Sequence, residues 1–152
     1  MTLDRLELTQ ALLGVYGVSF ALNLAWEMLQ MPLFRDMDWS PASWVLCAAA
    51  SLGDAAFSAA AYAALAVWHR NAWWIRSRSL FDLTLVVMGG MLSAFLGERI
   101  SLALGWWSYS SLMPLVPGLG VGVVPFVQLA ALTVVTFEVM RAFGPVRRAL
   151  RS

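Results

Sequence analysis

The chain is poor in charge and has no lysine. Of its 152 residues 12% are charged, the ten basic residues are all arginine, and nine acids leave a formal net charge of +1. A soluble domain usually has about 25% charged residues. A net charge this small provides no field that would attract nucleic acid. The composition therefore excludes an ordinary cytosolic domain, and we expect no nucleic-acid partner.

Cysteine and histidine are almost absent as well. Cys47 is the only cysteine and His69 the only histidine. This excludes a disulfide framework, a Cys/His zinc site, a haem-attachment motif and a Cys/His catalytic pair. We expect neither a metal nor a cofactor, so any chemistry would use carboxyl groups, arginine, hydroxyls and aromatic rings.

Long apolar runs dominate the rest of the sequence. Apolar residues make up 61% of the chain and the mean hydropathy is +0.73. A helix needs about 20 mostly apolar residues to cross a bilayer, and four such runs cover about residues 10–34, 42–68, 80–104 and 120–140. None of them alternates strictly as a barrel strand would. The sequence predicts an all-α, multi-pass transmembrane bundle of about four helices, in one domain over residues 1–152.

The arginines predict how this bundle lies in the membrane. Loops rich in Lys or Arg stay on the cytoplasmic side. Eight of the ten arginines fall before the first run, between the second and third, or after the fourth: Arg5, Arg70, Arg76, Arg78, Arg141, Arg147, Arg148 and Arg151. We therefore expect both termini on the cytoplasmic side of the cell (inner) membrane.

Several polar residues interrupt the apolar runs. A charged side chain at the centre of a spanning helix costs about 2.5–3.5 kcal/mol on insertion scales, so each one needs a reason. Glu27 and Glu98 fall in the outer halves of the first and third runs, and Asp54 falls near the middle of the second. We expect the three carboxyl groups to line one cavity beneath the uncharged, aromatic segment 105–114.

Two interpretations of these polar residues remain open. In the first they pair with one another: Arg99 neutralises Glu27 or Asp54, while Asn23 and Gln128 join helices through hydrogen bonds. In the second, three acids against one arginine leave a carboxyl without an opposite charge, and apolar surroundings favour its protonated form. Such an acid suits proton donation, also to a carbon–carbon double bond.

A short motif in the first run resembles a known family. Asn23-Leu24-Ala25-Trp26-Glu27 is similar to the Asn-x-Ala-Trp-Glu segment of the integral membrane terpene cyclases. In that family a glutamate of this motif and a second acid in a later helix start cyclisation by protonating a polyprenyl epoxide or alkene. The resemblance implies that Glu27 is the first acid, and it leaves Glu98 and Asp54 as alternatives for the second.

A second, weaker resemblance involves Glu98 and the segment after it. Glu98, Gly105-Trp106-Trp107-Ser108-Tyr109 and the later prolines are similar in layout to the Glu…Gly…Tyr pattern of membrane carotenoid hydratases, which add water to an isoprenoid double bond. The block 113–120 also resembles a family of small bacterial multi-pass membrane proteins. Those cyclases have more helices than this chain, which leaves open a homodimer that completes the cavity.

Three functional hypotheses follow. The first is an enzyme that protonates an isoprenoid, with Glu27, Glu98 and Asp54 as catalytic acids and a lipid-like molecule as partner. Its expected substrate-binding residues are Asn23, Trp26, Arg99, Trp107, Tyr109 and Gln128. The second hypothesis is a proton or cation carrier that uses the same acids. The third is a non-catalytic subunit that binds a pigment, quinone or lipid and uses its polar residues for helix pairing.

Overall fold

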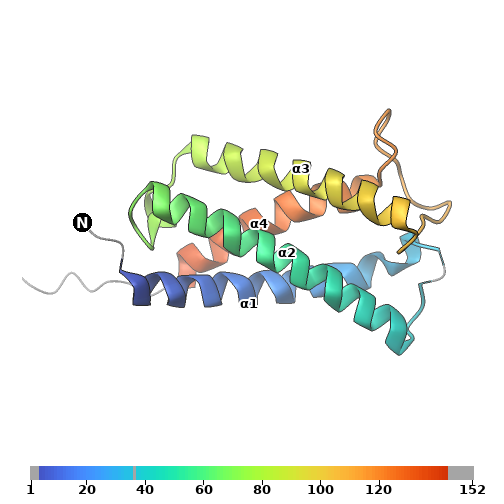
Figure 1. The fold of residues 1–152 in the computed structure, drawn as a ribbon, viewed down its shortest axis with the longest axis horizontal. Helices are drawn as coiled ribbons and strands as arrows, with labels where there is room; N and C mark the ends of the chain where they lie inside the picture. Colours follow the sequence, from blue (N-terminus) through green and yellow to red (C-terminus); the bar gives the residue numbers. More distant parts are fainter. Residues whose placement is uncertain (1–3, 36, 144–152) are drawn as a thin grey trace, which may run out of the picture.

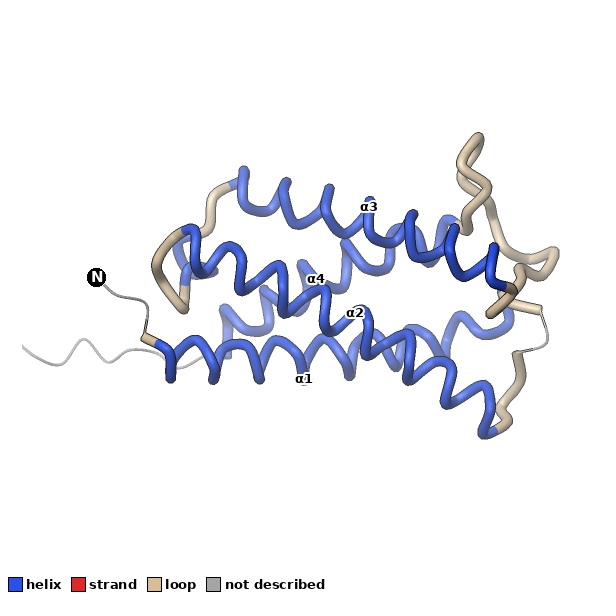
Figure 2. The backbone as a smooth tube through the Cα atoms, in the orientation of Figure 1, coloured by secondary structure: helices blue, strands red, loops and turns tan. Residues whose placement is uncertain are grey.

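The computed structural model describes residues 4–35 and 37–143, and its main elements are four long helices joined by loops (Figures 1 and 2). The helices are α1 (Arg5–Gln30), α2 (Pro41–Trp68), α3 (Leu80–Leu104) and α4 (Val123–Phe143). Two short 3-10 helices, η1 (Met31–Leu33) and η2 (Trp74–Ser77), follow α1 and precede α3. Each long helix is long and apolar enough to cross a membrane. The predicted all-α, four-span fold is therefore confirmed.

Two helices, α1 and α4, begin several residues away from the start of the predicted runs. α1 begins five residues earlier than expected, because Asp4 caps it by accepting hydrogen bonds from the backbone N–H groups of Leu6 (2.8 Å) and Glu7 (3.3 Å). α4 begins three residues later than expected. Gly118 and Gly120 have φ of +77° and +66°, a left-handed conformation that ends the preceding turn and delays the helix.

The helices run alternately up and down, so each loop lies at one of two ends (Figure 1). One end, which we call the arginine end, holds the start of α1, residues 69–79 between α2 and α3, and the end of α4. Residues 31–40 and 105–122 form the other end, which we call the loop end. The grouping predicted from the arginines is confirmed for Arg5, Arg70, Arg76, Arg78 and Arg141. Arg147, Arg148 and Arg151 lie outside the described residues.

The bundle is apolar outside and partly polar inside. Its exposed large side chains on the four helices are mostly aliphatic, among them Leu13, Leu29, Leu52, Val67, Leu85, Met88, Leu92, Leu96, Ile100 and Val135. Several serines, threonines, amides and acids are buried instead. This inversion fits a protein whose surroundings are hydrocarbon, where polar groups need partners within the bundle.

An aromatic cluster closes the bundle near the arginine end. The rings of Tyr62, Trp74 and Phe137 lie with centroids 5.4–5.8 Å apart and at steep angles, the tilted and edge-on geometry that such rings prefer. His69 stacks on Trp74 at 5.7 Å. The polar atoms are satisfied, since the Tyr62 hydroxyl donates to the Ala72 carbonyl (2.8 Å) and Trp74 Nε1 donates to the Tyr62 carbonyl (3.2 Å).

Two acids at the arginine end, Asp82 and Glu138, are paired with basic side chains. Asp82 accepts a hydrogen bond in the capping box that starts α3, and its Oδ1 lies 2.9 Å from His69 Nε2. Glu138 forms ion pairs with Arg78 and with Arg141. These acids are therefore accounted for by local structure.

Helices α3 and α4 approach each other through small residues. A Cβ atom at Gly90 would lie 2.8 Å from the Cα atom of Ala130, so only glycine permits this contact. α2 and α3, in contrast, separate toward the loop end (Figure 1). The space that opens there holds the candidate site.

Candidate functional site

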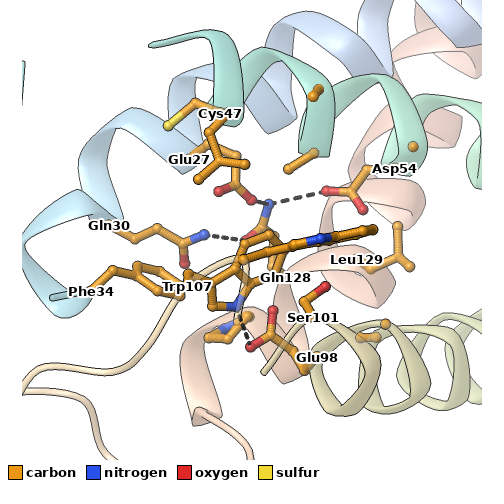
Figure 3. Close-up of a pocket in the computed structure, with 18 of the residues that line it drawn as sticks. Glu27, Gln30, Phe34, Cys47, Asp54, Glu98, Ser101, Trp107, Gln128 and Leu129 are labelled. Carbon is orange, nitrogen blue, oxygen red and sulfur yellow. Dashed lines mark hydrogen bonds between the residues drawn. The ribbon is translucent and has the colours of Figure 1, made fainter. Parts of the chain in front are cut away.

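A cavity of about 340 Å³ lies near the loop end, within the range of small-molecule pockets. All four long helices contribute to its walls, and the loop after α3 contributes two tryptophans (Figure 3). The residues that line it are Glu27, Gln30, Phe34, Met37, Leu46, Cys47, Ala49, Ala50, Gly53, Asp54, Ser93, Ala94, Gly97, Glu98, Ser101, Trp106, Trp107, Pro125, Gln128 and Leu129.

The three acids singled out in the sequence all line this cavity. Glu27 comes from α1, Asp54 from α2 and Glu98 from α3. Figure 3 shows Glu27 and Asp54 at one wall and Glu98 at another. The expectation that the carboxyl groups share one cavity is confirmed, while their catalytic role stays a prediction.

Gln128 of α4 connects the polar residues of three helices. Its Nε2 lies 2.7 Å from Glu27 Oε1, 3.2 Å from Asn23 Oδ1 and 3.3 Å from Asp54 Oδ2. Its Oε1 accepts a hydrogen bond from Gln30 Nε2 at 2.9 Å. An amide nitrogen carries two protons, yet three oxygens lie within hydrogen-bond distance of this one. The cluster is therefore short of donors.

Glu98 is held by the loop rather than by Gln128. The Tyr109 hydroxyl donates to Glu98 Oε2, which also accepts a hydrogen bond from Trp107 Nε1 at 3.4 Å. The same hydroxyl accepts from the Gly122 backbone N–H at 2.9 Å. Burial raises the pKa of Tyr109, and the hydrogen bond to Glu98 raises it further. The phenol therefore stays protonated and continues to donate to Glu98.

Backbone pairing fixes the loop over the cavity. The Arg35 N–H donates to the Ser108 carbonyl (2.8 Å), and the Ser110 N–H donates to the Leu33 carbonyl (3.0 Å). Phe34, between them, packs against Trp107 with ring centroids 6.2 Å apart. Of the aromatic residues expected in the roof, Trp106 and Trp107 line the cavity, whereas Tyr109 acts on it through Glu98.

A chain of buried hydroxyls leads from the cluster toward the middle of the bundle. Asn23 Nδ2 donates to the Ser19 carbonyl (2.9 Å) and hydroxyl (3.2 Å). Ser19 Oγ donates to Ser58 Oγ (2.9 Å), which lies 2.8 Å from Thr133 Oγ1. These bonds join α1, α2 and α4. Asn23 Oδ1 and Glu27 Oε1 both lie within hydrogen-bond distance of Gln128 Nε2, so the chain of hydroxyls continues into the acid cluster.

Two residues expected in the site are not there. Arg99 is exposed, it lines no part of the cavity, and no ion pair joins it to Glu27, Asp54 or Glu98 in the described residues. The expected pairing is not found there because Arg99 extends toward the loop after α3, where its Nη1 would lie 3.4 Å from a Cβ atom added at Gly120. Trp26 does not line the cavity either, and among the described residues its buried Nε1 has no hydrogen-bond partner.

Gln30 was not among the residues expected in the site. It is 5% exposed, it lines the cavity, and its Oε1 has no hydrogen-bond partner among the described residues. A usable signal existed, because Gln30 follows Glu27 by three positions and shares its helix face. Phe34, Cys47 and the hydroxyls of Ser19, Ser58 and Thr133 were also missed, and their residue types alone would not have marked them.

No group of three or more His, Cys, Asp or Glu side chains in the described part of the chain is arranged to hold a metal ion.

Comparisons with models of known protein families, with curated proteins and with solved structures found no match to this chain.

Proposed function

We propose that the chain is an integral membrane enzyme that protonates an isoprenoid lipid from a buried carboxylic acid, with a cyclisation or hydration as the outcome. The observation that carries the proposal is the shortage of donors around Gln128. Three oxygens compete for two amide protons. A proton on Glu27 or Asp54 would remove the shortage, and the same proton would be available to a bound alkene.

Glu27 is the proposed acid. Its Oε1 accepts the shortest of the three hydrogen bonds from Gln128, which leaves Oε2 to carry a proton toward the cavity. The O–H bond breaks, a new C–H bond forms at one alkene carbon, and the other carbon becomes a cation. Ring closure followed by loss of a proton, or addition of water followed by loss of a proton, completes the reaction and returns the proton to a carboxylate.

The other cavity residues suit the remaining roles. Asp54 or Glu98 would accept the returning proton, and Asn23 would orient Gln128 and Glu27. The rings of Trp106 and Trp107 line the cavity, and an aromatic face stabilises a cation. Arg99 and Trp26 have no part in this scheme.

The arginine end would face the cytoplasm, which places the cavity in the outer half of the inner membrane. One chain supplies all three acids, so a homodimer is not needed to complete the site. A reporter fused after residue 152 tests the orientation: an alkaline phosphatase fusion should be inactive and a fluorescent-protein fusion should be bright. The opposite pattern would reverse the assigned orientation.

Deuterium transfer tests the chemistry. Membranes that contain the protein are incubated in D₂O with polyprenyl alkenes and their terminal epoxides, and the products are examined by mass spectrometry. Because carboxyl protons exchange with solvent, the product should gain one carbon-bound deuterium. Glu27→Gln should abolish this product while the protein still inserts and folds, and Glu7→Gln, at the other end of the same helix, should retain it. Equal turnover by Glu27→Gln would overturn the proposal.

A second function is favoured by one observation. Gln128 and the Ser19–Ser58–Thr133 chain join helices, as a non-catalytic subunit that binds a lipid or pigment would require. For such a subunit, substitution of Glu27, Asp54 or Glu98 changes assembly and leaves no reaction rate to change.

A further inference from the structure

The cavity opens sideways, between α2 and α3, within the membrane-spanning part of the bundle. Gly53 of α2 and Gly97 of α3 line the cavity and are exposed. A Cβ atom added at either glycine would meet nothing within 4 Å. Both positions lie inside segments that can span the membrane. The opening therefore faces hydrocarbon rather than water.

The polar wall of the cavity is rich in acceptors. It holds three carboxyl groups and Gln30 Oε1, a buried oxygen that has no hydrogen-bond partner among the described residues. A buried acceptor without a partner costs about 1–3 kcal/mol, so a bound group that donates a hydrogen bond would be favoured here.

Positive charge, in contrast, is missing from the wall. Among the described residues that line the cavity none is Arg, Lys or His. A phosphate or a carboxylate would face three acids without a compensating cation. The hydroxyls of Ser93 and Ser101, which also line the cavity, can each donate to an uncharged oxygen.

We propose that the cavity binds a single-chain lipid alcohol, whose hydroxyl donates to the acceptor-rich wall and whose chain leaves between Gly53 and Gly97 into the bilayer. The inference deepens the proposed function and rests on it for the isoprenoid nature of the chain. It predicts that prenyl phosphates and diphosphates do not bind in the cavity. It also predicts that a plain hydrocarbon binds more weakly than the corresponding alcohol.

Cys47 is the only cysteine of the sequence, it lines the cavity and it is 1% exposed, so a reagent that labels it has to enter the cavity. Purified full-length protein in detergent micelles is treated with N-ethylmaleimide, and labelling is followed by mass spectrometry. Saturating farnesol should slow the labelling at least about tenfold, as about 90% occupancy requires. Farnesyl phosphate should not slow it, and farnesene should do so only at higher concentration. Equal protection by farnesyl phosphate, or by farnesene at the same concentration, would overturn the inference.

Variants test the two parts of the site. Gln30→Leu should reduce the preference for farnesol over farnesene by about fivefold to tenfold, the worth of about one hydrogen bond. Both ligands are compared on the same variant, so a partial loss of folded protein lowers both affinities equally and leaves their ratio unchanged. Gly53→Phe and Gly97→Phe should delay protection by farnesol. Gly17→Phe, at an exposed glycine of α1 with the same free space, should not. Identical behaviour of all three glycine variants would refute the lateral opening.

Dodecanol separates this inference from the proposed function, because it has a hydroxyl and no double bond to protonate. If dodecanol protects Cys47 and dodecyl phosphate does not, the binding site stands even when no isoprenoid gains deuterium. If isoprenoids gain deuterium while farnesyl phosphate protects as well as farnesol, the proposed function stands and this inference falls.

Discussion

The two ends of the bundle fill the space between the four helices differently. Near the arginine end, Tyr62, Trp74 and Phe137 interlock and their polar atoms find backbone partners. Near the loop end, a cavity remains and its wall has more acceptors than donors. The aromatic cluster fills its half and its polar atoms are paired, whereas the other half holds a cavity whose polar wall is short of donors.

The difference assigns packing stability to one end of the four helices and the candidate site to the other end. Close aromatic packing contributes dispersion contacts that do not depend on water, so the arginine end can hold the four helices together. The loop end can then tolerate a cavity and buried acids. Substitutions in the two halves should therefore change different quantities.

Trp74→Ala should have the largest effect on stability. Trp74 is fully buried and contacts two aromatic rings and His69, and removal of such a side chain costs about 3–5 kcal/mol. Thermal unfolding in detergent measures the loss, and ligand protection of Cys47 below the new Tm should be unchanged. Trp39→Ala, at a side chain 69% exposed, serves as the control. A similar decrease in Tm in both variants would show that the aromatic cluster contributes no special stability.

Gln128→Met should reduce both stability and activity. The substitution keeps the volume but leaves the Asn23, Glu27 and Asp54 oxygens without their common donor, and an unsatisfied buried group costs about 1–3 kcal/mol. Unfolding and deuterium incorporation are measured on the same preparation. Leu132→Met, a volume-conserving change on the same helix, should cost less than about 1.5 kcal/mol. Full activity in Gln128→Met would show that the cluster is structural only.

Ser58→Ala should have a smaller effect. Ser58 links Ser19 to Thr133 where the cavity half meets the packed half, and a hydrogen bond between membrane helices contributes about 0.6 kcal/mol on average. A double-mutant cycle with Thr133→Val isolates the coupling. A coupling of zero would mean that the hydroxyl chain does not join the halves energetically.

The smallest expected effect concerns pH at the loop end. Hydrogen bonds from the side chain and backbone of Ser40, together with the Ser43 hydroxyl, hold the pKa of Asp38 below its usual value of 3.8. A lowered pKa stabilises the folded protein above pH 3.8, and this contribution is lost as the pH falls through the lower, folded-state value. The difference in Tm between the wild type and Asp38→Asn should therefore be constant above that range and shrink below it. A difference that grows in acid would contradict the assigned hydrogen bonds.

The sequence predicted the four helices, their alternating direction and the convergence of three acids, because run length, arginine position and helix polarity determine them. It did not predict which way each helix is rotated. The rotation of α4 brings Gln128 to Glu27 and Asp54, and the rotation of α3 turns Arg99 away. Helix spacing could have placed Gln30 on the face of Glu27, whereas the direction of Arg99 depends on how α3 packs beside the loop that follows it.

The position of Gln128 on the last helix has a consequence for biogenesis. Chains emerge from the ribosome N-terminus first, so Glu27 and Asp54 enter the membrane before their shared donor has been synthesised. A nascent chain with three helices lacks the amide that bonds both acids, and synthesis of α4 supplies it. A chain cut short before residue 128 would therefore leave Glu27 and Asp54 without the donor that they share in the full chain.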